Sequence, residues 1–590
     1  MNHWLALLLF TCALLGPDLN AQEVLLNREY NPKTGTSLTV TAMSSQLPSS
    51  GYMAIRVSAR NGEKLPVNWS FHFTSKDHSW DSSNQLSSTF SLSCASGKQK
   101  NVEFLVPVVT AIQSDTPLVL ETRISASPPL SGNRIEMESQ QEHSWPGVLM
   151  SETLHTPNSS SLDAAISSGS RYGGGNFAGS FTPRDLSEDW RAYVGYDILM
   201  LTSADWTAIS PGAKNAILRW NRLGGRIILY ALTPSVTLAS LGIQEGDQTA
   251  RSTLRTWGEI EMLDLPKASL LDASDTVRFV TSSKLKPRAT TFGNELAASW
   301  PLQHAFGERS FNPVFFILIL IAFGIIVGPV NLFVFAKSGQ RHKLFITTPI
   351  ISLSASALLL LIIVFQDGFG GKGHRLALIE VQPEENTAYI QQQQIARTGV
   401  LLKTSFDTKD HAIISPVALD ESRWARITPS NGGGESRYRI SLGEQNTQSL
   451  SGDWYKSRSE YGHLVTSVQA TRGRLELLSP NGQPTITSTF DFPLEKIYYL
   501  DNNGSIWQSS GALTSGRKTQ LTPCPQADFN NWLNKQCKEL NTDSKKRFNL
   551  LANRRGHFIA LSNEGPFIGT LASLKWKEST ALITGPMVVR

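Results

Sequence analysis

The sequence predicts a multidomain membrane protein: a β-sandwich, an α/β unit with a parallel sheet, a transmembrane helical hairpin and a mostly-β C-terminal domain. Two apolar segments, 313–336 and 345–365, are long enough to span a bilayer. Apolar and polar residues alternate on both sides of these segments, which is typical of strands, and a strand–helix–strand pattern lies within 196–231. A chain of 590 residues has room for several such units.

Composition excludes several classes of protein. The chain has 54 Lys and Arg against 49 Asp and Glu, and this net charge of +5 is spread without a basic block, so we expect no nucleic-acid partner. Four cysteines cannot build a disulfide-dense or multi-zinc protein. No pair of Cys or His has zinc-ligand spacing, and we expect neither a metal site nor a cofactor.

Residues 1–21 have the layout of a secretory signal peptide. An apolar run at 4–15 is ended by Gly16-Pro17 and followed by Leu19-Asn20-Ala21, and we expect cleavage after Ala21. The run is too short to span a bilayer. The sequence therefore predicts that the rest of the chain is exported.

The two apolar segments predict a membrane hairpin with a cytoplasmic loop. At ~1.5 Å per residue each segment covers the ~30 Å hydrocarbon core of a bilayer. The loop between them, 337–344, carries Lys337, Arg341 and Lys343, whereas the outer flanks have mixed charges. By the positive-inside rule the loop is cytoplasmic and both flanking regions lie outside. An exported N-terminus predicts the same orientation.

Small and polar residues are expected to shape the packing of the hairpin. A GxxxG pattern and small residues on the second span favour close approach of the helices, proline predicts a kink, and an asparagine lies within reach of two threonines. These positions are Gly324, Gly328, Pro329, Asn331, Thr347, Thr348, Ser352 and Ser356. Neither span has an ionisable group at mid-depth, so an anchor is favoured over a proton or ion pathway.

The segment 22–143 is predicted to form an immunoglobulin-like β-sandwich. Alternation marks five short strands, at 37–42, 52–59, 67–74, 102–109 and 118–125. Asn61-Gly62 lies between the second and the third of these, and this dipeptide is the strongest short signal for a hairpin turn.

The segment 144–306 is predicted to be an α/β domain. Buried strands are expected at 147–150, 196–201 and 226–231. Ser210-Pro211 supplies an N-cap and a first-turn proline for a helix before the last strand. One face of this helix is apolar: Ala213, Ala216, Ile217, Trp220 and Leu223. A strand–helix–strand unit of this kind implies parallel pairing with a right-handed crossover.

The segment 366–590 is predicted to be a mostly-β domain with one helix near 529–540. Asn481-Gly482 and Asn503-Gly504 each join two strands as hairpin turns. Cys524 and Cys537 are a candidate disulfide because the exported compartment is oxidising, but the bridge requires 525–528 to double back along the helix. Cys94 is expected to be a buried thiol in a strand.

Three patterns are candidates for chemistry. Gly368–Gly373 matches G-x-G-x-x-G, but a membrane span precedes it and a strand follows, so we interpret it as a linker. Tyr172–Gly175 fits no phosphate-loop spacing and is interpreted as a mobile loop at a sheet edge. Asp185, Glu188 and Asp189 are either acid–base carboxylates or the solvated start of a helix.

The strands 196–201 and 226–229, with Trp220-Asn-Arg-Leu-Gly-Gly225 before the second, resemble the class I glutamine amidotransferase-like fold. Catalytic members of that family use a cysteine on a strand-to-helix elbow with a histidine and a glutamate. This chain has no cysteine between Cys94 and Cys524, and no histidine between His155 and His304. The resemblance therefore implies a degenerate, non-catalytic relative, and we expect no enzyme activity.

Gly328-Pro-Val-Asn331 and Thr347-Thr-Pro349, separated by a basic loop, are similar to a signature of largely uncharacterised bacterial envelope proteins. The resemblance implies an anchor in the inner (cytoplasmic) membrane, periplasmic N- and C-terminal regions, and partners such as MoxR-type ATPases, von Willebrand A-domain proteins or a permease. We expect a binding and assembly scaffold. The alternatives are an accessory ligand-binding subunit of a transporter, and a hydrolase that uses carboxylates of the α/β domain.

Overall fold

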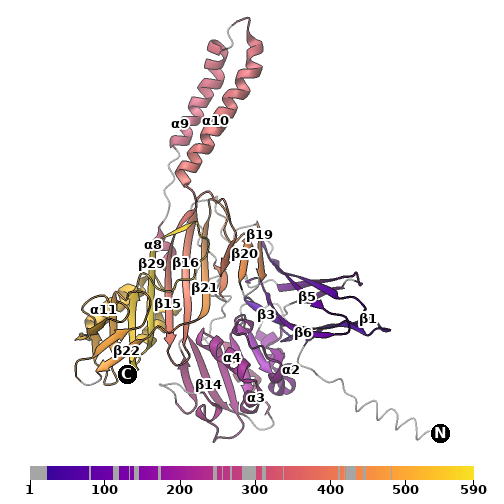
Figure 1. Cartoon of the computed structure of the whole chain (residues 1–590), viewed down its shortest axis with the longest axis vertical. Coiled ribbons are helices and arrows are strands. Elements are labelled where there is room, and N and C mark those ends of the chain that lie inside the picture. The colour runs from indigo at the N-terminus through magenta and orange to yellow at the C-terminus, as the bar shows by residue number, and fades with distance from the viewer. Residues whose placement is uncertain are drawn as a thin grey trace, which may run out of the picture.

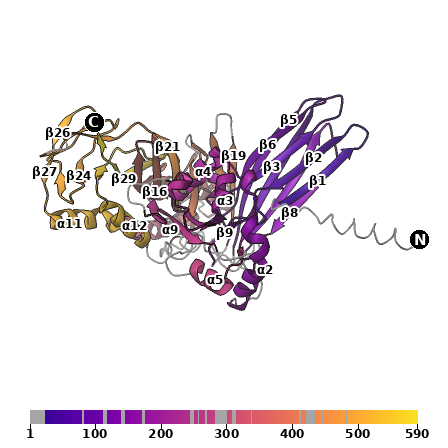
Figure 2. The same cartoon turned by 90° about the horizontal axis from the view of Figure 1, so that it is seen from below.

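The computed structural model is mostly β, with several sheets and two long apolar helices. It describes residues 23–78, 82–110, 118–131, 133–138, 145–169, 175–243, 249–255, 257–265, 269–281, 300–307, 314–335, 338–408, 412–417, 419, 434–442, 447–479 and 482–590. The hairpin projects from one end of the folded body, and the α/β unit forms the opposite end (Figure 1). Seen from below, the N-terminal strands lie on one side of the α/β unit and the C-terminal helices on the other (Figure 2).

The N-terminal strands build two facing sheets. The first sheet has the order β1-β2-β3-β6, from β1 (Glu23–Asn31), β2 (Thr36–Ala42), β3 (Tyr52–Arg60) and β6 (Gln99–Pro107). The second contains β5-β4-β7-β8, from β5 (Ser82–Cys94), β4 (Val67–His78), β7 (Leu118–Ser127) and β8 (Asn133–Glu138). Alternate residues of each strand, such as Val40, Ile55 and Phe71, are buried between the sheets.

The second sheet is completed by strands from the other side of the hairpin. β19 (Gly434–Leu442) pairs with β5 in parallel, and β20 (Gln448–Gly452) and β17 (Phe406–Thr408) continue the sheet to seven strands. Tyr438 and Ile440 of β19 enter the same apolar core as Phe71. The sandwich therefore does not end at residue 143, and the two segments that the sequence analysis separated share one sheet and one core.

The hairpin turn predicted at Asn61-Gly62 is wrong. β3 pairs with β2 and β6, whereas β4 pairs with β5 and β7, so the chain crosses from one sheet to the other at this point. Asn61 is fully buried, and its side-chain amide donates to the carbonyl oxygens of Leu65 and Cys94, both at 2.9 Å. The asparagine closes the end of the sandwich.

The predicted parallel strand–helix–strand unit is confirmed. β11 (Ile198–Thr202) pairs with β12 (Arg226–Ala231) in parallel, and α4 (Pro211–Arg222) connects them, with Ser210 accepting from the amide of Ala213 as its N-cap. The full sheet has the order β10-β9-β11-β12-β14-β13, from β10 (Gly179–Phe181), β9 (Val148–Ser151), β14 (Gly258–Asp264) and β13 (Ser252–Arg255) beside these two. Only β13 is antiparallel to its neighbour among these described strands.

Helices cover both faces of this sheet. α2 (Glu152–Gly169) and α5 (Ala273–Thr281) share one apolar core, while α3 (Ser203–Ala208), α4 and the short helix Trp190–Tyr193 lie in the other. The second core continues into the C-terminal sheet through residues such as Leu376 and Tyr389. Helix α8 (Pro301–Phe306) lies at the end of the segment assigned to the α/β domain but packs on the C-terminal sheet, where Trp300 donates to Gln393 at 3.0 Å.

The C-terminal region is mostly β, as predicted. Its largest sheet has the order β18-β21-β16-β15-β29-β28-β24-β25-β27, from β18 (Ile413–Val417), β21 (Glu460–Ala470), β16 (Thr387–Thr398), β15 (Gly371–Gln382), β29 (Leu574–Pro586), β28 (His557–Ser562), β24 (Lys496–Leu500), β25 (Ile506–Gln508) and β27 (Thr522–Pro523). A small sheet holds β26 (Lys518–Gln520), β23 (Thr485–Ser488), β22 (Leu475–Ser479) and β30 (Val588–Val589). Both predicted hairpins form, with Gly482 and Gly504 at positive φ.

The predicted helix near 529–540 is α11 (Gln526–Gln536), and α12 (Thr542–Ala552) follows it. The disulfide predicted between Cys524 and Cys537 is absent: both are free, buried thiols. The cysteines stand at opposite ends of α11, and the chain does not double back, so the helix keeps them ~16–18 Å apart at ~1.5 Å per residue. Cys94 is a free buried thiol at the end of β5, as predicted.

Two helical segments of the described chain, Ile317–Phe335 and Arg341–Leu361, are long and apolar enough to cross a membrane. The first combines α9 (Val314–Ile325) with a π-helix (Ile326–Phe335), and the second begins with a short turn at Arg341–Lys343 and continues as α10 (Leu344–Asp367). Pro329 lies inside the π-helix. Because proline has no N–H to donate, it removes one bond of the regular helical pattern at this point.

Candidate functional site at the carboxyl edge of the parallel sheet

The parallel sheet has one position where its strand order reverses. From β9 the chain moves to β10 on one side and then to β11 on the other, so β9 and β11 flank this point. Open α/β sheets place ligands outside the carboxyl ends of the strands at such a switch point. Ser151 ends β9 and Thr202 ends β11, and we take their surroundings as the candidate site.

A buried carboxylate joins these two strand ends. Asp205, on α3, accepts hydrogen bonds from the hydroxyls of Ser151 at 2.7 Å, Thr202 at 2.8 Å and Thr153 at 2.9 Å, and from the amide of Thr202 at 3.0 Å. Thr202 in turn caps α3 by accepting from the amide of Asp205. This reciprocal capping box places the carboxylate between β9, β11 and the first turn of α2.

Three hydroxyls and one backbone amide therefore converge on the Asp205 carboxylate, which fixes the orientation of these hydroxyls. The histidine nearest to Asp205 in the sequence is His155 on α2. Burial lowers the pKa of His155 and outweighs Asp163 and the backbone of Ala178, which both raise it. Among the described residues no group of His, Cys, Asp and Glu is placed to hold a metal ion.

The candidate acid–base residues are held by separate partners. Asp185 pairs with Arg56 of β3 at 3.4 Å, Glu188 accepts from Ser210 at 3.0 Å, and Asp189 pairs with Arg191 at 2.6 Å. The Asp185 contact binds the α/β unit to the first sheet of the sandwich, the Glu188 contact holds the N-cap residue of α4, and Asp189 caps a short helix. The interpretation as a solvated helix start is too simple, because Asp189 caps the helix Trp190–Tyr193 and the other two make tertiary contacts. Of the Gly-rich stretch near Tyr172, only Gly175 lies in the described part of the chain.

A buried charge network connects the α/β unit to the C-terminal sheet. Arg222, at the end of α4 and 4% exposed, pairs with Glu385 at 3.0 Å and faces Glu380, which is 1% exposed, at 3.9 Å. Arg255 of β13 approaches Glu385 at 3.8 Å, and the Tyr389 hydroxyl donates to Glu385 at 2.5 Å. We call these five residues the inter-unit charge network.

The network shifts the pKa values of two of its members. Burial alone would raise the pKa of Glu385, but the charges of Arg222 and Arg255 and the Tyr389 hydroxyl outweigh it and hold this pKa below its ordinary value. Burial, followed by the Glu385 carboxylate, raises the pKa of Tyr389. Glu385 is therefore ionised and Tyr389 neutral at pH 7, as the hydrogen bond between them requires.

A cavity lies where the sandwich meets the C-terminal strands. It has a volume of about 30 Å³ and is lined by residues of both regions, including Tyr52, Val108, Ile414, Tyr438 and Trp454. Ligand pockets are usually ~300–1,000 Å³. This cavity has the size of one or two water molecules and is a packing space rather than a ligand site.

Polar residues tie the hairpin together, as predicted. The side-chain amide of Asn331 donates to the Thr348 hydroxyl at 2.9 Å, and Thr347 donates to the Asn331 carbonyl oxygen at 2.6 Å. Asn331 is fully buried between the helices. Hydrogen bonds of this kind contribute roughly 0.6 kcal/mol each on average within membranes.

The packing role predicted for Gly324, Gly328 and Ser356 is wrong. A methyl group added to either glycine would meet no described atom within 4 Å, and Ser356 is exposed. The half-buried positions of the first helix include Phe323 and Val327, and those of the second include Ser352. The face of the first helix that contacts the second therefore lies one residue before Gly324 and Gly328, and it carries large side chains instead of glycines.

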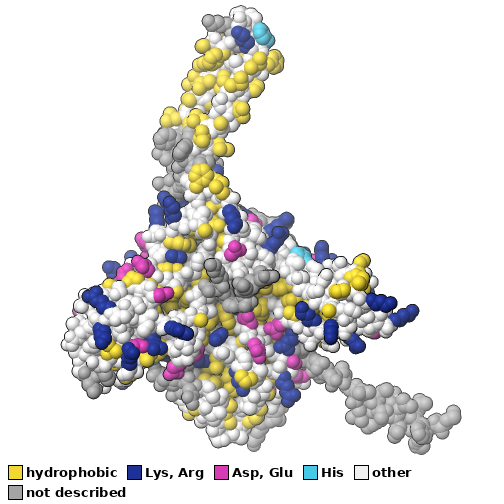
Figure 3. All heavy atoms as spheres, in the orientation of Figure 1, with side chains coloured by type: hydrophobic (Ala, Val, Ile, Leu, Met, Phe, Trp, Pro, Cys, Tyr) yellow, Lys and Arg dark blue, Asp and Glu magenta, His cyan; other side chains and the backbone are white. Residues whose placement is uncertain are grey.

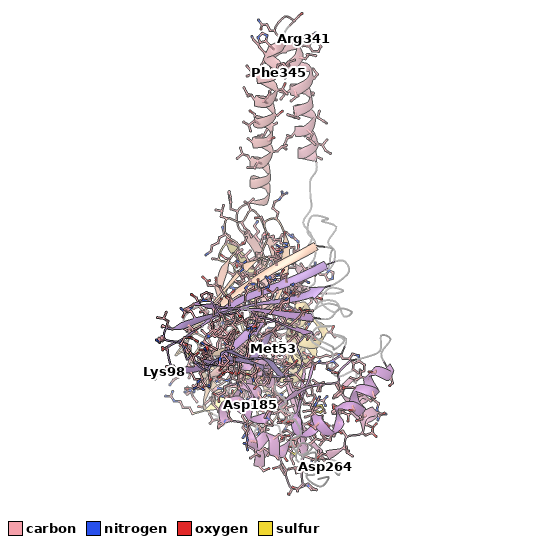
Figure 4. The ribbon with its side chains drawn as sticks, turned by 90° about the vertical axis from the view of Figure 1, so that its right-hand side faces the viewer. Met53, Lys98, Asp185, Asp264, Arg341 and Phe345 are labelled. Carbon is pink, nitrogen blue, oxygen red and sulfur yellow. The ribbon has the colours of Figure 1, made fainter. Side chains whose placement is uncertain are left out.

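The basic residues predicted to set topology lie at the tip of the hairpin. Arg341 lies at the end farthest from the folded body (Figure 4). Lys343 belongs to the same short turn, both side chains are exposed, and Lys337 falls outside the described residues. Two features of the body were not predicted from the sequence: the Asp205 group and the inter-unit charge network. Thr202-x-x-Asp205 after a buried strand is a capping-box signature that indicates the first, whereas nothing local indicates the second.

A buried histidine predicts acid sensitivity. His463 of β21 is enclosed by Tyr455, Tyr461 and Trp454, and burial lowers its pKa from 6.5 to about 4. The unfolded chain binds this proton more readily, so stability is complete above pH ~6.5 and falls by about 3 kcal/mol as the pH drops to ~4. Unfolding of wild type and His463→Phe, followed across this range, should show a flatter slope for the variant.

His304→Gln, at an exposed position, is the control and should keep the wild-type slope. An equal slope for His463→Phe and wild type would show that other groups cause the acid sensitivity.

Comparisons with known proteins identify no family. No family model matches the sequence, and no curated protein matches it. Solved structures with local likeness include a Paenibacillus sp. cycloisomaltooligosaccharide glucanotransferase complexed with cycloisomaltoheptaose, at 10% identity and a TM-score of 0.16, over 35% of this chain and 29% of that one. A Bacteroides uniformis beta-glucuronidase 2 calcium-binding mutant matches at 7% identity and a TM-score of 0.13, over 33% of this chain and 24% of that one.

The same glucuronidase covalently bound to cyclophellitol-6-carboxylate aziridine matches at 8% identity and a TM-score of 0.13, over 36% of this chain and 25% of that one. This chain thus spans less than a third of the length of these proteins. TM-scores of this size support no inference about fold or function.

Proposed function

We propose that the chain is a non-catalytic membrane protein of the bacterial cell envelope whose folded body is a binding and assembly scaffold. One observation carries the proposal: strands from before and after the hairpin share a single sheet, through β5 and β19. Since one sheet cannot lie on both sides of a bilayer, both flanking regions occupy the same compartment. The two apolar helices then cross the membrane and return.

The orientation and the origin of the protein belong to the same proposal. The basic loop with Arg341 and Lys343 favours the cytoplasm, which leaves the body in the periplasm and the hairpin in the inner membrane. The parallel order of β9, β11 and β12 supports an α/β unit related to amidotransferase-like domains. The resemblance of the hairpin to envelope proteins points to an ATPase, an A-domain protein or a permease as partner.

Co-purification tests the scaffold proposal. The full-length protein, extracted from its own membranes in mild detergent, is expected to bring one envelope protein with it in a fixed ratio, identified by mass spectrometry. The hairpin alone, residues 313–366, is the control for detergent-driven association and should not retain that protein. Full-length protein that emerges without any such partner would contradict the proposal.

The second candidate is an accessory ligand-binding subunit of a transporter. The observation that favours it is the Asp205 group, which gathers three hydroxyls, two of them buried, at the switch point of the parallel sheet. A ligand bound there would raise the melting temperature of the full-length protein, and Asp205→Asn would reduce that rise. The hydrolase alternative is not carried forward, because Asp185, Glu188 and Asp189 are each held by a different partner.

A further inference from the structure

Apolar side chains are exposed on the folded body where it meets the hairpin. Phe369, two residues beyond α10, is 67% exposed, and Leu402, in the loop after β16, is 89% exposed. Leu402 is as exposed as Phe345 of α10, which is 86% exposed on the membrane-spanning helix itself. Hydrophobic side chains continue from the hairpin to its base in the space-filling view (Figure 3). Isolated exposed residues are common, so position and surroundings decide what these two do.

The connection between α10 and the body is short and held by backbone hydrogen bonds. Residues 368–370 lead from α10 to β15, and the amide of Gly370 donates to Val400 at 3.0 Å while that of Val400 donates to Gly368 at 2.9 Å. Gly368 and Gly370 have φ of 72° and 78°, and a side chain on Gly370 would meet the Ser573 carbonyl oxygen at 2.3 Å. The glycines that mimic a nucleotide motif therefore form a tight turn, as the linker interpretation predicts.

This turn holds the body against the end of the helix. Three residues reach at most ~10 Å. The 24 residues of α10 extend ~36 Å at ~1.5 Å per residue, slightly more than the ~30 Å hydrocarbon core. When α10 spans a bilayer, the segments around Phe369 and Leu402 lie in the headgroup layer.

Basic residues surround the same place. Lys372 of β15 and Lys575 of β29 are exposed partners on neighbouring strands, and Lys403 follows Leu402 and is also exposed. Figure 3 shows Lys and Arg side chains on both sides of the base of the hairpin. Apolar tips with lysines beside them fit the boundary between acyl chains and anionic headgroups.

We propose that this juxtamembrane surface, made of Phe369, Leu402, Lys372, Lys403 and Lys575, rests on the lipid bilayer. Phe369 and Leu402 enter the interfacial layer, and the three lysines meet lipid phosphates. The inference rests on the proposed membrane location of the hairpin. Its consequence is a fixed tilt of the body, which directs the α/β unit away from the membrane and toward other envelope proteins.

Site-directed fluorescence in vesicles tests the proposal. The full-length protein is reconstituted in phosphatidylcholine and phosphatidylglycerol with one introduced cysteine that carries an environment-sensitive fluorophore, and a headgroup-region nitroxide lipid is the quencher. Cys94, Cys524 and Cys537 are buried, and labelled wild type gives the background. The reporter is Leu402→Cys.

Two further positions are controls. Phe345→Cys reports on the hairpin itself. Leu232→Cys is the matched control, 54% exposed and next to Ala231, the register partner of Asp264, at the far end of the body (Figure 4).

Quenching several-fold stronger at 402 than at 232, together with quenching at 345, is the expected result. Lys372→Glu with Lys403→Glu should weaken quenching at 402 and leave it unchanged at 345. If position 345 is quenched but position 402 is quenched no more than position 232, the juxtamembrane proposal is overturned and the membrane location of the hairpin still holds. Absence of quenching at 345 would overturn the membrane location itself, and a blue shift at 402 without quenching would assign the surface to a protein contact instead.

Discussion

Splitting the chain between its two apolar helices will leave the two halves bound to each other. Segments 1–338 and 339–590, produced together, are expected to purify as a one-to-one complex through size-exclusion chromatography in detergent. β5 and β19 pair in parallel from Ser82↔Gly434 to Ser88↔Ile440, and the buried cores contain residues of both halves. An interface built like the interior of a domain does not dissociate at ordinary dilution.

Two variants on β19 test whether its buried face holds the two halves together. Ile440→Asp puts a charge into the core of the sandwich and should strongly reduce recovery of the complex. Arg439→Asp, one residue earlier on the exposed face, should leave recovery unchanged. Two halves that elute apart, each folded, would contradict both the shared sheet and the compartment argument drawn from it.

Removing the cation of the inter-unit charge network will destabilise the body severely. Arg222→Ala leaves the carboxylate of Glu380, 1% exposed, without the guanidinium that faces it, and Glu385 loses its nearest cation. Breaking a buried ion pair by deleting one partner costs ~3–5 kcal/mol. We expect a fall of this size in the free energy of unfolding, and protease cleavage in the α/β unit under conditions where wild type resists.

A surface pair in the same unit is the control. Arg251 and Asp264 are 2.7 Å apart but solvent-exposed, so Arg251→Ala should leave the free energy of unfolding close to the wild-type value. Replacing both buried partners, Arg222→Met with Glu380→Leu, should recover part of the loss, because no unpaired charge then stays between those positions. If Arg222→Ala is as stable as wild type, water reaches the inter-unit charge network and the prediction is wrong.

Local structure was predictable from the sequence. The helix after Ser210-Pro211 begins at its predicted N-cap, and the turns at Gly482 and Gly504 join neighbouring strands as expected. The contact of Asn331 with Thr347 and Thr348 also followed from position alone. These features depend on residues within a few positions of each other, or on two helices joined by a short loop.

The incorrect predictions all concern choices between distant partners. Asn61-Gly62 has ideal hairpin residues, yet the chain crosses between sheets because Asn61 bonds to Cys94, 33 residues away. Gly324 and Gly328 could face either way around their helix, and the π-helix with its buried Asn331 sets the contact face elsewhere. Cys524 and Cys537 share a compartment but are separated by a straight α11.

Part of the candidate site could also be predicted from local sequence, and part could not. The capping residues Thr202 and Asp205 can be found by their spacing, but their bonds to Ser151 and Thr153 depend on β9 lying beside β11. Arg222 and Glu380 are far apart in the sequence, and nothing near either residue indicates that the two would be buried together.

Many of the strands, the capped helix of the α/β unit and the two apolar spans with their basic loop could be predicted from the sequence. Each of these follows from periodicity, capping or length, which act over one segment at a time. The pairing of β19 with β5, and the attachment of the α/β unit to the C-terminal sheet, became visible only in the folded chain. Alternation indicates which face of a strand is buried, but it does not choose the neighbouring strand, because backbone hydrogen bonds can join any two strands whatever their sequence.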